Sequence, residues 1–358
     1  MILGSRENIN KLFSIPVQYK VPHYQRRYVW DETNWRKLSE DILAMLGLEF
    51  VEDLNSNFSF KSKDTCEDDR THSLRSKYKD EHFTGILVIR PINEDVPEKF
   101  DVIDGQQRLA TFQIILCVIR DIFESKGFNN RAQEIEVLIK GTMSTIPYQK
   151  FITTKYDESS FVKIINGAYS PLTTHKNKRV IRNTLDTYDF FYKWILCYVQ
   201  KSESNKNTID EEKLGDLLSI INTNFYFVPL KLEKNDNSEE IFESLNATGR
   251  KLSDFDYLRN NLFLRAGKLG VEPDSNRSYS EIFYDQYWKF EQDGPYYWQT
   301  DIQEEFLQAF LEAKLGDGCF SAQHVRPFDM YKKYSMTVAK GIEDEFKELH
   351  DFAKSFKP

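Results

Sequence analysis

The first group of residues whose types and spacing could do chemistry is Asp104, Gly105, Gln106, Gln107 and Arg108. The apolar run before them predicts a strand, and apolar residues spaced three and four apart after them predict a helix to about Ser125. A strand that turns at a glycine directly into a helix leaves unbonded N–H groups at the positive end of the helix dipole. Such a turn is suited to binding phosphate.

A second interpretation of this turn involves no ligand. If Asp104 is the N-cap of the helix, Gln107 three residues later completes a capping box, worth about 1 kcal/mol. That arrangement accounts for Asp104 and Gln107 but leaves Gln106 and Arg108 without a role. The sequence leaves both interpretations open.

A second polar segment lies near the N-terminus and contains Tyr24, Gln25, Arg26, Arg27 and Tyr28. Arginine binds a phosphate with two parallel hydrogen bonds, and a neighbouring aromatic ring can stack on a base, so the segment is a candidate DNA contact. The alternative is structural: Tyr28, Trp30 and Trp35 are core residues, and the arginines pair with acidic neighbours.

The third group is a predicted loop between two short helices, containing Asn246, Thr248, Gly249, Arg250 and Lys251. Asn, Thr and two cations together could contact the phosphates or ribose of a nucleotide. Ser253 then caps the next helix, with Asp256 at the box position. An ordinary helix–turn–helix with surface cations is the alternative.

Several common kinds of active site are absent from the sequence. The phosphate-binding pattern G-x-x-x-x-G-K-[ST], the zinc motif H-E-x-x-H and the nucleophile turn G-x-S-x-G do not occur. The six histidines never pair at metal-ligand spacing, so we predict no metal site formed by side chains alone.

Composition limits the class of protein. The chain has 358 residues, enough for two or three domains, and 40% of them are hydrophobic, which is typical of a globular protein. Its net charge of −8 argues against sequence-independent binding of plain DNA. No run of 18 apolar residues and no apolar leader is present, and the four cysteines are far apart. We therefore expect a cytoplasmic protein with reduced cysteines and no membrane partner.

Hydrophobic periodicity gives the order of elements. We predict an α+β domain over residues 1–125 and a mainly helical domain over 126–358, with residues 50–82 as an exposed hairpin or insertion. Strand 224–232 in the second half is a candidate to return to the sheet of the first domain. The predicted strands are 84–89, 99–103 and 224–232. After the helix that ends near Ser125, the predicted helices are 131–142, 159–168, 178–200, 211–222, 238–245 and 254–266.

Taken together, these segments resemble one family. The resemblance is carried by four patterns in order: P-x-Y-Q-R-x-Y-V-W, T-G-I-L-V-I, D-G-Q-Q-R-L-x-T and F-x-x-L-N-x-T-G-x-x-L-S-x-x-D. This is the signature of the GmrSD-type restriction enzyme N-terminal domain, a family that includes the GmrS subunit and the N-terminal half of the phosphorothioate-sensing SspE proteins. The patterns span about residues 8–265.

The resemblance implies a ParB/sulfiredoxin-like α+β domain with a helical extension, and an antiphage role in a restriction system. It implies recognition of modified double-stranded DNA, with phosphorothioate or modified cytosine as the mark, by Tyr24, Gln25 and Arg26. It also implies hydrolysis of GTP or ATP, with Mg²⁺, at Asp104–Arg108. We expect Gln106 or Gln107 to orient the attacking water, Arg108 and Arg250 to neutralise charge, and Asp104 to hold Mg²⁺ or act as base.

The cutting activity is expected to lie elsewhere. No His–Asn nuclease signature occurs before Pro358, so an HNH-type nuclease domain or subunit is the expected partner. The alternative function is a non-catalytic module that binds modified DNA while a partner does the chemistry.

Overall fold

The computed structural model describes residues 2–51, 58–62, 81–93, 97–171, 183–200, 208–233, 236, 253–275, 277–288, 302–321 and 325–356. The chain divides into two compact units. The first comprises Met1–Pro22 and Arg27–Asp236, and the second comprises His23–Arg26 and Asn237–Pro358. The short segment His23–Arg26 therefore leaves the first unit and packs within the second.

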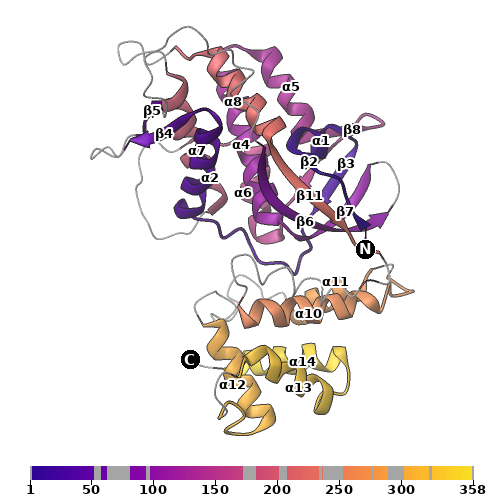
Figure 1. Cartoon of the computed structure of the whole chain (residues 1–358). Helices are drawn as coiled ribbons and strands as arrows, with labels where there is room; N and C mark the ends of the chain where they lie inside the picture. Colours follow the sequence, from indigo (N-terminus) through magenta and orange to yellow (C-terminus); the bar gives the residue numbers. More distant parts are fainter. Residues whose placement is uncertain are drawn as a thin grey trace. The chain divides into compact units, whose positions relative to one another are not determined.

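A mixed sheet forms the framework of the first unit (Figure 1). Its strands lie in the order β1-β11-β6-β7-β3-β10, and β2 also pairs with β11. Two separate hairpins, β4–β5 and β8–β9, accompany it. The strands are β1 (Ile2–Leu3), β2 (Glu7–Asn8), β3 (Val17–Lys20), β4 (Leu48–Val51), β5 (Ser59–Ser62), β6 (His82–Asn93), β7 (Glu98–Asp104), β8 (Lys140–Met143), β9 (Ile146–Gln149), β10 (Phe151–Ile152) and β11 (Phe225–Lys231).

Strand β11 confirms that a strand from the second half of the sequence returns to the first sheet. It pairs in parallel with β6 from Phe225↔His82 to Lys231↔Ile89. The residues Phe225, Phe227 and Leu230 on β11 are buried, which gives the strand a hydrophobic reason to insert beside β6.

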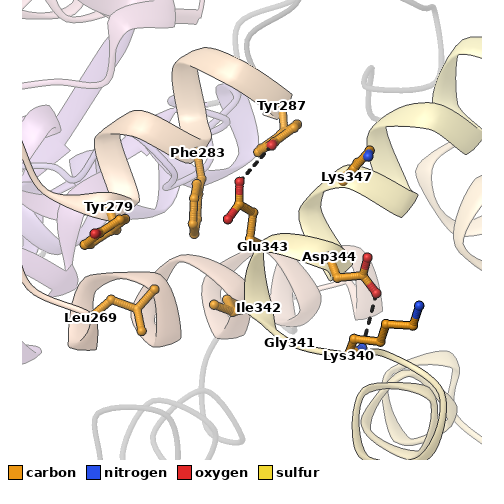
Figure 2. Close-up of a pocket in the computed structure, with 10 residues that line it drawn as sticks. All are labelled: Leu269, Tyr279, Phe283, Tyr287, Lys340, Gly341, Ile342, Glu343, Asp344 and Lys347. Atoms are coloured by element: carbon orange, nitrogen blue, oxygen red, sulfur yellow. Dashed lines mark hydrogen bonds between the residues drawn. The ribbon is translucent and has the colours of Figure 1, made fainter. Parts of the chain in front are cut away.

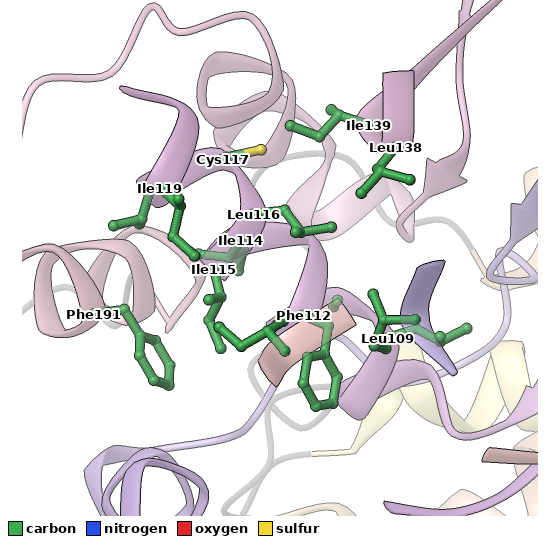
Figure 3. Packing of buried hydrophobic residues seen from close by; sticks show 14 of the residues in the cluster. Leu109, Phe112, Ile114, Ile115, Leu116, Cys117, Ile119, Leu138, Ile139 and Phe191 are labelled. Carbon is green, nitrogen blue, oxygen red and sulfur yellow. The ribbon is translucent and has the colours of Figure 1, made fainter. Parts of the chain in front are cut away.

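Helices of the first unit pack around a shared core (Figure 1). Sixteen of the twenty residues of α4 are buried, so this helix is surrounded by protein rather than lying on a surface. Figure 3 shows Leu109, Phe112 and Leu116 of α4 among the apolar side chains of this core. The helices are α1 (Ile9–Ser14), α2 (Glu32–Met45), α4 (Gln106–Ser125), α5 (Asn129–Ile139), α6 (Lys155–Ile165), α7 (Asn183–Val199) and α8 (Glu211–Asn224).

The second unit is helical in the part that the structure describes. Its core is rich in aromatic residues, among them Phe263, Trp288 and Phe346. Helix α10 packs against α11, α12, α13 and α14. The elements are α10 (Asp254–Lys268), α11 (Tyr279–Phe283), the π-helix η1 (Tyr284–Trp288), α12 (Gln303–Leu315), α13 (Pro327–Thr337) and α14 (Ile342–Ser355).

The α+β class predicted from the sequence is confirmed. Helix α4 has the predicted bounds, whereas the helix predicted over 131–142 ends at Ile139. The reason is the β8–β9 hairpin, in which the ring of Tyr148 lies so close to Gly141 that a Cβ there would be 2.3 Å from it. The predicted helix 238–245 lies outside the described residues.

The division between the compact units follows Asp236, not the predicted boundary at residue 125. Helices α5, α6, α7 and α8 come after residue 125, yet their apolar faces share one core with α4 and the sheet. Within the predicted insertion 50–82, the described residues include the end of β4 and strand β5, which form an antiparallel hairpin.

Candidate functional site

The turn after β7 is built around Gly105. Strand β7 ends at Asp104, and Gly105 is the N-cap of α4 with a φ of 98°. That left-handed conformation is open to glycine and costly for other residues. A Cβ there would also lie 2.9 Å from the Cδ1 atom of Leu87. The spacing from strand to helix therefore depends on this glycine.

Because Gly105 is the cap, the alternative interpretation in which Asp104 caps α4 is wrong. Asp104 still belongs to β7, where it pairs with Val88 of β6. Its carboxylate accepts a hydrogen bond of 3.1 Å from Nη2 of Arg108 instead of one from the helix backbone. Among the described residues, no side chain makes a cap bond at this helix end.

The first turn of α4 accordingly keeps backbone donors available. The N–H of Leu109 donates to the carbonyl of Gly105 and is the first to bond back along the chain. Among the described residues, no acceptor receives the backbone N–H of Gln107 or Arg108. These donors lie at the positive end of a 20-residue helix, an arrangement that attracts anions.

The guanidinium of Arg108 is bound by residues 84–86 of β6, here called the cradle, which the motif alone does not reveal. Its Nη1 donates to the carbonyl of Thr84 and its Nη2 to the carbonyl of Ile86, each at 3.0 Å. The residue between them, Gly85, has a φ of +132°, and a Cβ on it would lie 1.6 Å from Nη1. The pairing of β6 with β11 shifts register at this point, so Gly85 sits beside a β-bulge. Only a residue without a side chain fits there.

Solvent still reaches the charged pair at this turn. The side chain of Asp104 is 31% exposed and that of Arg108 is 22% exposed. The guanidinium also lies 6.0 Å from the ring centroid of Phe227 on β11. A carboxylate and an arginine thus stand at the surface next to unbonded N–H groups.

Gln107 has a different task from the one expected in a capping box. Its Oε1 accepts from the N–H of Val29 at 2.8 Å, and its Nε2 donates to the carbonyl of Arg27 at 3.2 Å. The capping-box interpretation of Gln107 is therefore wrong, because its amide bonds to the backbone of Arg27 and Val29. Gln106 is buried beside it on α4.

Tyr28, between Arg27 and Val29, makes four hydrogen bonds to other parts of the first unit. Its hydroxyl bonds to Oγ1 of Thr111 at 2.7 Å and accepts from Nε1 of Trp35 at 3.1 Å. Its N–H donates to Oδ2 of Asp157 at 2.7 Å, and its carbonyl accepts from Nδ2 of Asn183 at 2.8 Å. Burial raises the pKa of Tyr28 to about 12 and also raises the pKa of Asp157.

Asp157 and Asn183 were not singled out from the sequence. They lie 129 and 155 residues away from Tyr28, in α6 and α7, and carry no local motif. Tyr28 and Trp35 are core residues, as the structural alternative predicted. Arg27 is partly exposed.

Residues 23–26 belong to the second unit and pack on α10 and α11. Nε2 of His23 lies 3.2 Å from the carbonyl of Ser280, and the ring of Tyr24 stacks on Phe263 at 5.3 Å between centroids. Nη1 of Arg26 is 3.9 Å from Oδ2 of Asp256. Tyr24 and Gln25 are buried, whereas Arg26 is partly exposed.

The third predicted group lies outside the described residues, which resume at Ser253. Ser253 is the N-cap of α10, and its side chain accepts from the N–H of Asp256 at 3.0 Å. This cap was predicted from the sequence and is confirmed.

A groove of about 750 Å³ in the second unit contains none of the predicted site residues. Leu269, Phe283 and Ile342 supply apolar lining (Figure 2). Its charged residues are Lys340, Glu343, Asp344 and Lys347, so positive and negative charges balance. Such a lining gives no net attraction for phosphate.

The described ranges contain neither a side-chain metal site nor a membrane-spanning helix. There, no three His, Cys, Asp or Glu side chains are grouped so that they could hold a metal ion. No helix in these ranges is both long and apolar enough to cross a membrane.

The architecture and the turn define the class of protein: an α+β unit whose strand β7 passes through Gly105 into helix α4, joined to a helical unit. Residues 7–263 match the family model described as the GmrSD restriction endonuclease, N-terminal domain. This match covers more than half of the chain, and the protein belongs to that family. It is therefore a component of a DNA-acting restriction system. No match was found among curated proteins.

Proposed function

We propose that this chain is the sensor module of a modification-dependent restriction system, which recognises modified DNA and hydrolyses a nucleoside triphosphate to control a nuclease. The nucleotide part is supported mainly by one observation, the uncapped N–H groups of Gln107 and Arg108 next to partly exposed charged side chains. Membership of the restriction family supports the DNA part.

In this proposal the phosphates of GTP or ATP lie on the N–H groups that follow Asp104. Arg108, with Arg250 as a second cation, neutralises charge on the transferred phosphoryl group. Mg²⁺ in such sites is held by one or two carboxylates and by the phosphates themselves. The carboxylate of Asp104 is partly exposed and accepts one bond from Arg108, so it fits this role.

The hydrogen bonds of Gln107 bear on which glutamine orients the attacking water. Both ends of its amide are occupied by the backbone of Arg27 and Val29. We therefore assign the water-orienting role to Gln106 and a positioning role to Gln107.

On the DNA side, burial separates the predicted contacts. Arg26 and Arg27 are partly exposed and suit phosphate oxygens, while Tyr24, Gln25 and Tyr28 are buried and reach DNA only if their segment moves. With a net charge of −8, plain DNA should bind weakly and with a strong dependence on salt. Selectivity then rests on the modified group, either phosphorothioate or a modified cytosine.

The second candidate function is a non-catalytic module that binds modified DNA while a partner nuclease cuts. The bonds of Arg108 to the carbonyls of Thr84 and Ile86 favour it, because they give this arginine a structural reason to be present.

Phosphate release from the purified chain separates the two functions. GTP, ATP and CTP would each be supplied alone, with plain duplex, with phosphorothioate duplex and with glucosyl-hydroxymethylcytosine duplex. Turnover stimulated by one modified duplex supports the sensor that hydrolyses nucleotide. Binding of a modified duplex without turnover of any nucleotide supports the passive module.

A further inference from the structure

Helix α10 has a buried stripe that includes polar side chains, although a helix in a core normally places apolar side chains there. Asp256, Asn260 and Phe263 follow one another at spacings of four and three, so they lie along one face of the helix. Asn260 is only 2% exposed, and Arg259 beside it is also buried.

The polar groups of this stripe are not equally bonded. Oδ1 of Asp256 accepts from Nη2 of Arg259, and Oδ2 faces Arg26. Asn260, in contrast, has no hydrogen-bond partner for either Oδ1 or Nδ2 within the described part of the chain, and Nε of Arg259 has none either.

An unbonded buried amide is costly. Each buried donor or acceptor without a partner costs about 1–3 kcal/mol, and an apolar side chain of the same shape would avoid that cost. Such groups are rare in folded proteins, and a ligand that supplies the missing bonds is one physical reason to keep them.

The segment above the stripe is the predicted DNA contact. Tyr24 stacks on Phe263 at one end, and Arg26 reaches Asp256 two helical turns away. Asn260 lies between these two positions on the same face of α10, and we infer from this spacing that it faces the same segment. The Arg26–Asp256 contact is long, at 3.9 Å, and the arginine is partly exposed, so this end of the segment is the weaker one.

The side-chain amide presents a donor and an acceptor side by side. The matching ligand must offer an adjacent acceptor and donor, and the edge of a nucleobase does so. A base reaches a buried amide only when it leaves the stack, as in proteins that turn a nucleotide out of the duplex. Arg26 at the open end suits the phosphate attached to that nucleotide.

We infer that Asn260 hydrogen-bonds the edge of a base of the bound modified DNA, under the segment Tyr24–Arg26. This inference rests on the proposed recognition of modified DNA and adds the residue that reads a base. It gives a function to an amide that makes no hydrogen bond within the described part of the second unit.

The test compares Asn260→Leu with the wild type and with Asn222→Leu. The second variant removes another amide, in α8 of the first unit, whose Oδ1 has no partner in the described part of the chain. Binding to a fluorescein-labelled phosphorothioate duplex and to a glucosyl-hydroxymethylcytosine duplex would be measured by anisotropy, and Tm by calorimetry. We expect Asn260→Leu to keep or raise Tm and to bind the recognised duplex about tenfold to a hundredfold more weakly, since a bidentate base contact is worth about 1–3 kcal/mol. Asn222→Leu should bind as the wild type does.

A scan of abasic sites around the modification identifies the base. One abasic position should weaken binding to the wild type but not to Asn260→Leu, because the contact is already lost in the variant. Equal affinity of the two proteins for the intact duplex, or the same abasic penalties in both, would overturn the inference. If the wild type binds neither modified duplex, the proposed function fails together with it; if the wild type binds and Asn260→Leu binds equally, the inference alone fails.

Discussion

Residues 27–29 and residues 24–26 are neighbours in the sequence but have opposite surroundings. In the first stretch, Gln107, Asp157 and Asn183 satisfy four backbone groups with hydrogen bonds. The second stretch packs on α10 above Asn260, which has both amide atoms unbonded among the described residues. The chain after the Arg26–Arg27 peptide bond is therefore held by hydrogen bonds to its backbone, whereas the chain before it packs on a helix that contains an unbonded amide among the described residues.

This difference in hydrogen bonding suggests different roles for the two stretches: residues 27–29 fix the backbone, and residues 24–26 lie where a ligand could bind. A fully bonded buried network specifies one conformation of the backbone, whereas an unbonded polar group lowers stability unless something binds to it. By this reasoning the first unit holds residues 27–29 in place, and the second unit keeps a position ready for a ligand.

The largest effect is expected from Gly85→Ala, which would show how far the turn after β7 depends on its cradle. A methyl group 1.6 Å from Nη1 of Arg108 would break the bonds to Thr84 and Ile86, and the φ of +132° adds strain. We expect a loss of roughly 2–6 kcal/mol in the free energy of unfolding, measured with urea, and loss of turnover.

Gly215→Ala is the matched control for that change. Gly215 lies inside α8, and a Cβ on it would have nothing within 4 Å, so alanine should stabilise the helix by about 0.5–1 kcal/mol. Equal stabilities of Gly85→Ala and the wild type would contradict the structure of the cradle.

Asp104→Asn tests the charge at the turn with little change in shape. The asparagine can still accept from Arg108, so Tm should stay close to that of the wild type, while phosphate release should fall at least about 100-fold. Asp101→Asn, on the same strand and paired with Arg90, is the control and should retain turnover. Full turnover in Asp104→Asn would remove this carboxylate from the proposed chemistry.

Gln107→Leu and Asn260→Leu compare the loss of a hydrogen-bonded amide beside residues 27–29 with the loss of the Asn260 amide beside residues 24–26. The first leaves the carbonyl of Arg27 and the N–H of Val29 without partners, so it should lower the free energy of unfolding by about 1–3 kcal/mol. The second removes an amide that has no hydrogen bonds to the described residues, and it should leave stability equal or higher. Chemical denaturation of both variants measures these changes, and destabilisation of the same size in both would abolish the distinction between the two stretches.

The smallest effect is a dependence on pH that Asp157 contributes. Burial raises its pKa above the ordinary 3.8, so between 3.8 and the folded value the folded chain binds more protons than the unfolded chain. Its contribution to stability therefore falls as pH rises through that window. Asp157→Asn can still accept from Tyr28 but lacks the charge.

Denaturation of the wild type and of Asp157→Asn over a pH series measures this contribution. The stability of the variant relative to the wild type should increase with pH across the window and then level off. A relative stability that decreases as pH rises would mean that the pKa of Asp157 is lowered in the folded protein.

Local patterns in the sequence predicted the elements around the site well. Helix α4, the strands β6 and β7 and the cap Ser253 follow from periodicity and from residue types within a few positions. The return of β11 to the sheet was predictable because its run of apolar and aromatic residues has the length of a buried strand.

The partners of the motif residues were harder to predict, because they depend on tertiary contacts. Gly85 looks like one residue of an apolar strand, and only the position of Arg108 explains it. Gln107 has the spacing of a capping residue, but the left-handed Gly105 takes the cap and leaves the amide to bond with Arg27 and Val29. Asn260 belongs to no pattern that marks an unbonded buried amide.

The most direct test of the account is the rate of phosphate release at saturating nucleotide with a modified duplex, divided by the rate with a plain duplex of the same sequence. Hydrolysis controlled by recognition of modified DNA predicts a ratio well above one for phosphorothioate or for modified cytosine. A ratio of one, with the modified duplex shown to be bound, would contradict hydrolysis controlled by recognition and leave a passive DNA-binding module.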